Sequence, residues 1–106
     1  MKIFKKNLKK DFITVAEIGV NHEGRFTYAK KLIKLASKTG VDAVKFQCYN
    51  PERYVSTSEI ERFKRIKKFS LNRKQFKELS LLAKKNNLGF FATPITEDYV
   101  PFLNKI

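Results

Sequence analysis

The sequence is short of the residues that would indicate a secreted or membrane protein. Its single cysteine, Cys48, leaves no disulfide framework within the 106 residues, which is typical of a reducing compartment. No stretch approaches the roughly 18 apolar residues of a membrane span. The short apolar run near the N-terminus is interrupted by Glu17 and matches a signal peptide poorly. We therefore expect a soluble, cytoplasmic protein.

Acidic residues are few, and the formal net charge is +13. Such an excess can mark a nucleic-acid-binding protein, because clustered cations displace counterions from phosphates. Here the 18 lysines are spread along the whole chain and only five arginines accompany them. Bidentate reading of bases favours arginine, and no glycine–arginine or aromatic–basic alternation is present. A lysine-rich solvated surface is the simpler interpretation, with a polyanion-binding α/β module as the alternative.

Three segments have the composition of strands and are separated by helical patterns. Residues 12–19, 41–48 and 88–93 are rich in β-branched and aromatic residues. Apolar residues at helical spacing predict a helix over 25–38, with Leu32 and Leu35 widening its buried stripe. A polar connection over 49–58 and a basic, weakly amphipathic segment lead to a second helix that ends near Lys85. Ser70 or Asn72 could cap this helix, and Thr96 or Asp98 could start a last one containing Pro101.

This order predicts an α/β fold. Two strands joined by a helix form a βαβ unit, which implies a parallel sheet and a right-handed crossover. Three successive βα units suggest the start of a (β/α)₈ TIM barrel, whose active site lies at the carboxyl ends of the strands. A complete barrel needs about 250 residues. We therefore expect residues 12–106 to be an incomplete, N-terminal portion of a barrel, preceded by a basic lead-in over residues 1–11.

Strand alternation brings four polar residues together. In a strand, side chains two positions apart point to the same face of the sheet. On the inner face, each expected strand is therefore apolar near its amino end and polar near its carboxyl end. Glu17, Lys45, Gln47 and Thr93 would then converge at one mouth. A charge on a buried strand is costly unless it is paired, so Glu17 and Lys45 could neutralise each other. The pair could be purely structural or could serve a polar ligand.

Three ordered motifs carry a family resemblance. AEIGVNHEG, DAVKFQ and FFATP follow one another, each at the end of an expected strand. In this order and at these separations they resemble the N-terminal half of the sialic acid synthase family, the N-acetylneuraminate synthase type. Relatives that make legionaminic or pseudaminic acid share these motifs, so the resemblance leaves the acceptor sugar open.

The resemblance implies a transferase that condenses phosphoenolpyruvate with an N-acetylated amino sugar and releases phosphate. The product is a nonulosonic, sialic-type acid, and a divalent Mn²⁺ or Mg²⁺ ion polarises the aldehyde. By the same resemblance, Lys45 binds phosphoenolpyruvate and Thr93 hydrogen-bonds it. Glu17 faces the sugar and the reacting carbonyl, and Gln47 lines the site. Lysine suits a polyanionic substrate because its ammonium is a compact charge.

The chain also departs from the family pattern. The family's metal-binding histidines lie on later strands, and a lone His22 cannot form a metal site. No metal ligand is therefore assigned here. His22 is expected either to order the first loop with Asn21 and Gly24 or to contact a ligand directly. The segment Glu61–Phe69 is more basic than the family pattern and lacks a clear counterpart of a sugar-contacting asparagine.

The leading hypothesis is thus an N-terminal fragment of a synthase barrel, expected to be inactive alone. It would need the missing barrel half, or association with other copies, to cover its sheet edges. The full family enzymes are usually dimers through a domain that is absent here. An inactive product of a truncated gene is a further alternative, besides the polyanion-binding module.

Overall fold

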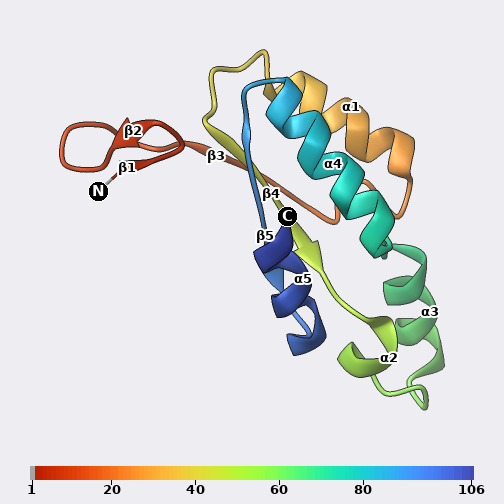
Figure 1. Ribbon diagram of the computed structural model, residues 1–106. Coiled ribbons are helices and arrows are strands. Elements are labelled where there is room, and N and C mark those ends of the chain that lie inside the picture. Colours follow the sequence, from red (N-terminus) through yellow and green to blue (C-terminus); the bar gives the residue numbers. More distant parts are fainter. Residues whose placement is uncertain (1) are drawn as a thin grey trace.

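A three-stranded parallel sheet forms the centre of the molecule. The computed structural model describes residues 2–106, and its sheet consists of β3 (Val15–Gly19), β4 (Ala43–Cys48) and β5 (Gly89–Pro94) in that order (Figure 1). All three strands lie where the sequence predicts them, although β3 begins three residues later than expected. The α/β class and the parallel pairing are confirmed.

Two helices cover one face of this sheet. Figure 1 shows α1 (Phe26–Ala36) and α4 (Arg73–Lys85) side by side on the same side of the strands. Their buried residues meet the strand residues Val44, Phe46 and Cys48 in a single core. The buried stripe of α1 is confirmed with one exception, because Leu35 is 59% exposed. At 100° per residue Leu35 lies about 200° from the buried Ile33, so it faces away from the sheet.

A capping box fixes the start of α4. The side chain of Asn72 accepts a hydrogen bond from the Gln75 backbone N–H, and the Gln75 side chain accepts one from the Asn72 N–H, both at 2.8 Å. Of the two caps that the sequence left open, Asn72 is therefore the correct one. Ser70 instead donates to the Lys67 carbonyl at the end of the preceding helix.

The long connection after β4 is more ordered than the sequence indicated. It contains a short helix, α2 (Pro51–Tyr54), whose first turn is capped by the Asn50 side chain. The basic segment forms α3 (Ile60–Lys68), and none of its residues is buried. After β5 the chain forms a 3₁₀ turn, η1 (Glu97–Tyr99), and α5 (Val100–Lys105), with Pro101 in the first turn as expected. These short helices gather at the carboxyl end of the strands (Figure 1).

The segment expected only as a basic lead-in forms an antiparallel hairpin over the described residues 2–11. Its strands are β1 (Lys2–Ile3) and β2 (Lys6–Asn7). Phe4 stacks on Phe91 with ring centroids 6.0 Å apart, and its ring lies against Gly89, where an added Cβ would clash with it. The hairpin therefore covers the amino-terminal end of the face that the helices leave open.

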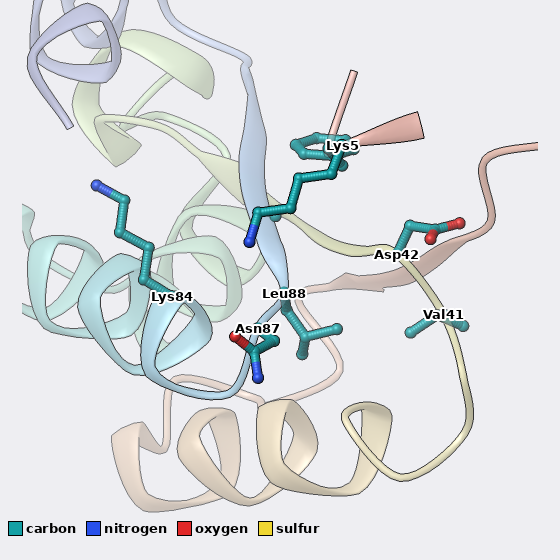
Figure 2. A pocket seen from close by; sticks show the side chains of 8 residues that line it. Lys5, Val41, Asp42, Lys84, Asn87 and Leu88 are labelled. Atoms are coloured by element: carbon teal, nitrogen blue, oxygen red, sulfur yellow. The ribbon is translucent and has the colours of Figure 1, made fainter. Parts of the chain in front are cut away.

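A cavity of about 330 Å³ lies where the hairpin meets the amino ends of β4 and β5. Figure 2 shows Lys5 of the hairpin, Lys84 and Asn87 around it. Asp42, also in its wall, accepts hydrogen bonds from the Thr14 backbone and pairs with Lys6 Nζ at 3.1 Å. Lys84 sits in the last turn of α4, where a cation complements the helix dipole. The Lys6–Asp42 ion pair therefore joins the hairpin to the residue that precedes β4.

Gly24 allows the first βα loop to pack against the end of α3. Its φ is +77°, and an added Cβ would lie 1.8 Å from the Lys68 carbonyl oxygen. We expect Gly24→Ala to lower the free energy of unfolding by roughly 2–4 kcal/mol, measured by chemical denaturation. Gly40→Ala is the matched control, because Gly40 has φ +84° but nothing within 4 Å of the added Cβ. Equal losses in the two variants would contradict the packing argument.

Candidate functional site

Polar side chains converge on the sheet face that no helix covers. The strand register pairs Glu17 with Lys45 and Gln47 with Thr93. Directly opposed residues of neighbouring parallel strands point to the same face, and the buried Phe46 lies on the other one. The register therefore places Glu17 beside Lys45, and Gln47 beside Thr93 near the carboxyl ends of their strands, on one face of the sheet. That the four residues serve one site stays a prediction.

Glu17 and Lys45 form an ion pair with 3.7 Å between Oε2 and Nζ. Their side chains remain 52% and 33% exposed, respectively. An ion pair this open to water contributes at most about 1 kcal/mol to stability. Fold stability therefore gives little reason for this pair, and both charged groups remain accessible to a ligand.

Gly19 shapes the same site through its backbone. The register of β3 shifts between Glu17 and Gly19, and Gly19 has φ +57°. A Cβ at Gly19 would lie 3.5 Å from Glu17 Oε1 and 3.8 Å from Gln47 Nε2. A side chain at this position would therefore lie beside the carboxylate and the amide, and glycine leaves that space free at the end of β3.

That loop contains Asn21, which is exposed, and His22, which is only 1% exposed. His22 Nδ1 accepts a hydrogen bond from the Gly24 N–H at 3.0 Å. Its ring lies against Phe46, with ring centroids 6.0 Å apart. Burial lowers the pKa of His22 below its usual value, while the Gly19 backbone acts in the opposite direction. The imidazole is thus neutral and lies inside the loop rather than on the open face.

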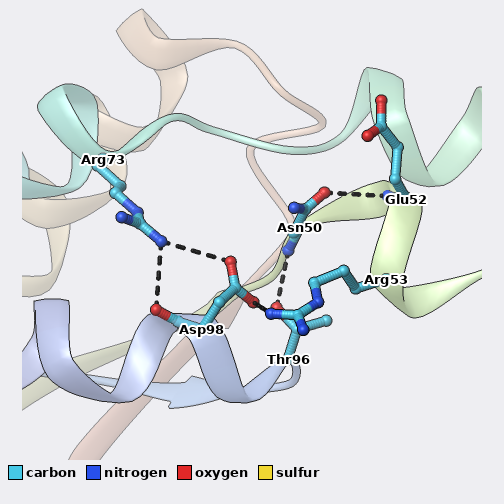
Figure 3. Close-up of polar contacts among 6 residues, drawn as sticks. All are labelled: Asn50, Glu52, Arg53, Arg73, Thr96 and Asp98. Atoms are coloured by element: carbon cyan, nitrogen blue, oxygen red, sulfur yellow. Dashed lines mark hydrogen bonds and ion pairs between the residues drawn. The ribbon is translucent and has the colours of Figure 1, made fainter.

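A polar cluster that the sequence did not indicate joins the loops after β4 and β5 (Figure 3). Asp98 accepts a hydrogen bond from Arg73 Nη2 at 3.4 Å and lies 3.8 Å from Arg53 Nη1. Beside it, the Asn50 N–H donates to the Thr96 hydroxyl at 2.9 Å. The sequence predicts for Asp98 only a possible role as a helix start. Its partners, Arg73 and Arg53, are 25 and 45 residues away in the chain. No local sequence pattern predicts an ion pair over such a separation.

Cys48 ends β4 in the core, and burial raises the pKa of its thiol to about 12. At about pH 8 the thiol is therefore neutral as well as inaccessible, and only the thiolate reacts with disulfide reagents. We expect labelling by a chromogenic disulfide to be slow in the native protein and immediate in denaturant. Labelling of the native chain as fast as that of free cysteine would contradict this burial.

The structure offers no donor set for a metal ion within residues 2–106. Over this range no three histidine, cysteine, aspartate or glutamate side chains form a group that could hold one. Within the same residues, no helix is long and apolar enough to cross a membrane. The Mn²⁺ or Mg²⁺ that the family resemblance implies does not fit the residues present.

The sheet, its one-sided helical cover and its polar open face define an α/β protein with a parallel sheet. The crystal structure of N-acetylneuraminic acid synthetase from Leptospira borgpetersenii, in complex with citrate, superposes with a TM-score of 0.81 at 30% identity. The match covers 89% of this chain and 33% of that one. The chain belongs to the NeuB family, whose model matches residues 32–106.

Synthases from Campylobacter jejuni and from human are similar in sequence to this chain. The N,N'-diacetyllegionaminic acid synthase of Campylobacter jejuni is 37% identical over 112 residues, covering 93% of this chain and 33% of the relative. The human N-acetylneuraminate-9-phosphate synthase is 31% identical over 106 residues, covering 87% and 29%. The resemblance seen in the motifs is confirmed. The chain spans about a third of the length of these relatives.

Proposed function

We propose that this chain forms the first three βα units of a (β/α)₈ barrel in a nonulosonic acid synthase. In the reaction of such a synthase, phosphoenolpyruvate condenses with an N-acetylated amino sugar, a carbon–carbon bond forms and phosphate is released. Membership of the NeuB family supports the reaction class. The observation that carries the proposal is the convergence of Glu17, Lys45, Gln47 and Thr93 on the open sheet face.

The chemistry of these side chains suits a small polyanion. The Lys45 ammonium supplies a fixed cation for the carboxylate or phosphate of phosphoenolpyruvate. The Thr93 hydroxyl and the Gln47 amide, paired across β4 and β5, supply hydrogen-bond donors beside it. Glu17 holds Lys45 in place from β3 and would face the sugar and its reacting carbonyl. Its negative charge would keep the second anionic group of the substrate on the far side of Lys45.

Two further expectations belong to this proposal. The divalent ion would be held by parts of the fold that correspond to the unmatched two thirds of the relatives. The protein would act in the cytoplasm, which is consistent with its one cysteine lying buried as a free thiol. Neither expectation alters the roles given to Glu17, Lys45, Gln47 and Thr93.

The test is a graft into a complete synthase. Residues 12–106 would replace the matching segment of the Campylobacter jejuni legionaminic acid synthase. Phosphate release would then be measured with phosphoenolpyruvate, Mn²⁺ and a panel of N-acetylated amino sugars. We expect turnover with at least one sugar and a condensation product detectable by mass spectrometry. A folded graft that releases no phosphate with any acceptor would count against the proposal.

One observation favours a different function. The five basic residues of α3 are all exposed; they are Arg62, Lys64, Arg65, Lys67 and Lys68. A solvated cationic helix can bind a polyanion through counterion release, with steep salt dependence. Tight, salt-sensitive binding of the chain to RNA, DNA or heparin, combined with an inactive graft, would favour this alternative over the synthase.

A further inference from the structure

The loop that joins β3 to α1 is built around one buried side chain. Backbone hydrogen bonds close successive turns along it: Asn21 to Ile18, Glu23 to Val20, and Arg25 to His22, each at 2.9 Å. Glu23 and Gly24 both have positive φ, at +54° and +77°. Glycine adopts a positive φ readily, but at Glu23 such a backbone persists only when its surroundings hold it. The His22 ring supplies the interior contact that a loop of this kind requires.

The His22 contacts connect this loop to the site. On one side, Nδ1 accepts from the Gly24 N–H at 3.0 Å, at the point where Gly24 packs on the end of α3. On the other side, the ring lies on Phe46, the residue between Lys45 and Gln47 in β4. The loop also follows directly on Gly19, where β3 ends two residues after Glu17. The other ring nitrogen, Nε2, has no hydrogen-bond partner among the described residues.

We propose that His22 is a positioning residue: its ring, with Nδ1 as acceptor for Gly24 and with Phe46 of β4 beside it, fixes the first βα loop and so sets the placement of Glu17 and Gln47 at the strands that the loop and the ring adjoin. A direct ligand role is disfavoured, because the ring is 1% exposed and lies beside Phe46 on the helix-covered side of the sheet. The hydrogen bond from Gly24 requires Nδ1 to be unprotonated, so the proton resides on Nε2. This inference rests on the proposed function only for its effect on catalysis.

Two variants separate the hydrogen bond from the volume of the ring. His22→Asn keeps an acceptor oxygen near the place of Nδ1, whereas His22→Leu keeps apolar bulk and has no acceptor. Since His22 is the only histidine, a ¹⁵N spectrum of the 106-residue chain reports its tautomer without ambiguity. Amide exchange at Gly24 reports the hydrogen bond, and both readouts are independent of any enzymatic activity.

The expected results differ between the variants. The spectrum should show the Nε2–H tautomer, and the Gly24 amide should be protected in the original chain and in His22→Asn but not in His22→Leu. In the graft, His22→Leu should lower kcat/KM by about ten- to a hundredfold through misplacement of the site, and His22→Asn should restore most of it. A Nδ1–H tautomer, retained Gly24 protection in His22→Leu, or equal activity of both variants would overturn the inference. An inactive graft with the expected tautomer and exchange would instead indicate failure of the proposed function.

Discussion

Replacing Lys45 by alanine in the graft should lower kcat/KM by about 30- to 1,000-fold, which corresponds to roughly 2–4 kcal/mol of lost transition-state stabilisation. The register places Lys45 between Glu17 of β3 and Phe91 of β5. Its removal would leave the substrate anion beside the Glu17 carboxylate, with only the neutral donors of Gln47 and Thr93 to bind it. Steady-state phosphate release, at varied phosphoenolpyruvate, measures the effect.

Two controls make this result specific. Lys45→Arg should recover only part of the activity, because the planar guanidinium needs more room than an ammonium. Lys38→Ala removes an exposed lysine just beyond α1 and should change the free energy of unfolding by no more than about 0.5 kcal/mol. Its activity should match that of the unmodified graft. Full turnover by the Lys45→Ala graft would remove Lys45 from the proposed site.

The second large effect concerns the 106-residue chain by itself, which should make no sugar acid and should associate in solution. Within the described residues, β3 and β5 each pair only with β4, so each presents a free edge. The face opposite the helices exposes Val15 by 38% and Phe91 by 37%. Parallel sheets normally have both faces covered, and free edges template pairing with other chains. The Glu17–Lys45 pair, open to water, would attract a ligand only weakly.

Light scattering coupled to gel filtration and a phosphate-release assay test this expectation together. The assay would contain phosphoenolpyruvate, N-acetylmannosamine and Mn²⁺. We expect a mass above that of one chain, a broad thermal transition and no phosphate above background. A monomer with a cooperative melt and steady phosphate release would show that the three βα units are sufficient on their own.

Local patterns predict most of the fold and the face of the sheet that Glu17, Lys45, Gln47 and Thr93 share. The alternation in DAVKFQ fixes which residues share a face, and parallel pairing then brings Lys45 beside Glu17. The apolar character of Leu35 predicts burial, and this prediction is wrong because the position of Leu35 on the helix turns its side chain away from the sheet. Composition indicates that a residue can be buried, whereas helical geometry decides whether it is.

The parts that could not be predicted depend on contacts between distant residues. The hairpin over residues 2–11 is held by Phe4 against Phe91 and by Lys6 against Asp42. Asp98 likewise depends on arginines in two other helices. The sequence left two roles open for His22, since burial depends on where the loop lies relative to Phe46. Helices and strands can be predicted from the residues within each segment. A contact between residues far apart in the chain leaves no such local pattern.

Protection of Lys45 by phosphoenolpyruvate would test the central claim most directly. The graft would be acetylated sparingly with and without the substrate, and modification at each lysine would be read by mass spectrometry. Lys45 should lose most of its labelling when phosphoenolpyruvate is present, while Lys38 and Lys77, both exposed on the helical side, should be labelled equally in both samples. Equal labelling of Lys45 in the two samples, at a substrate concentration that saturates turnover, would contradict the account.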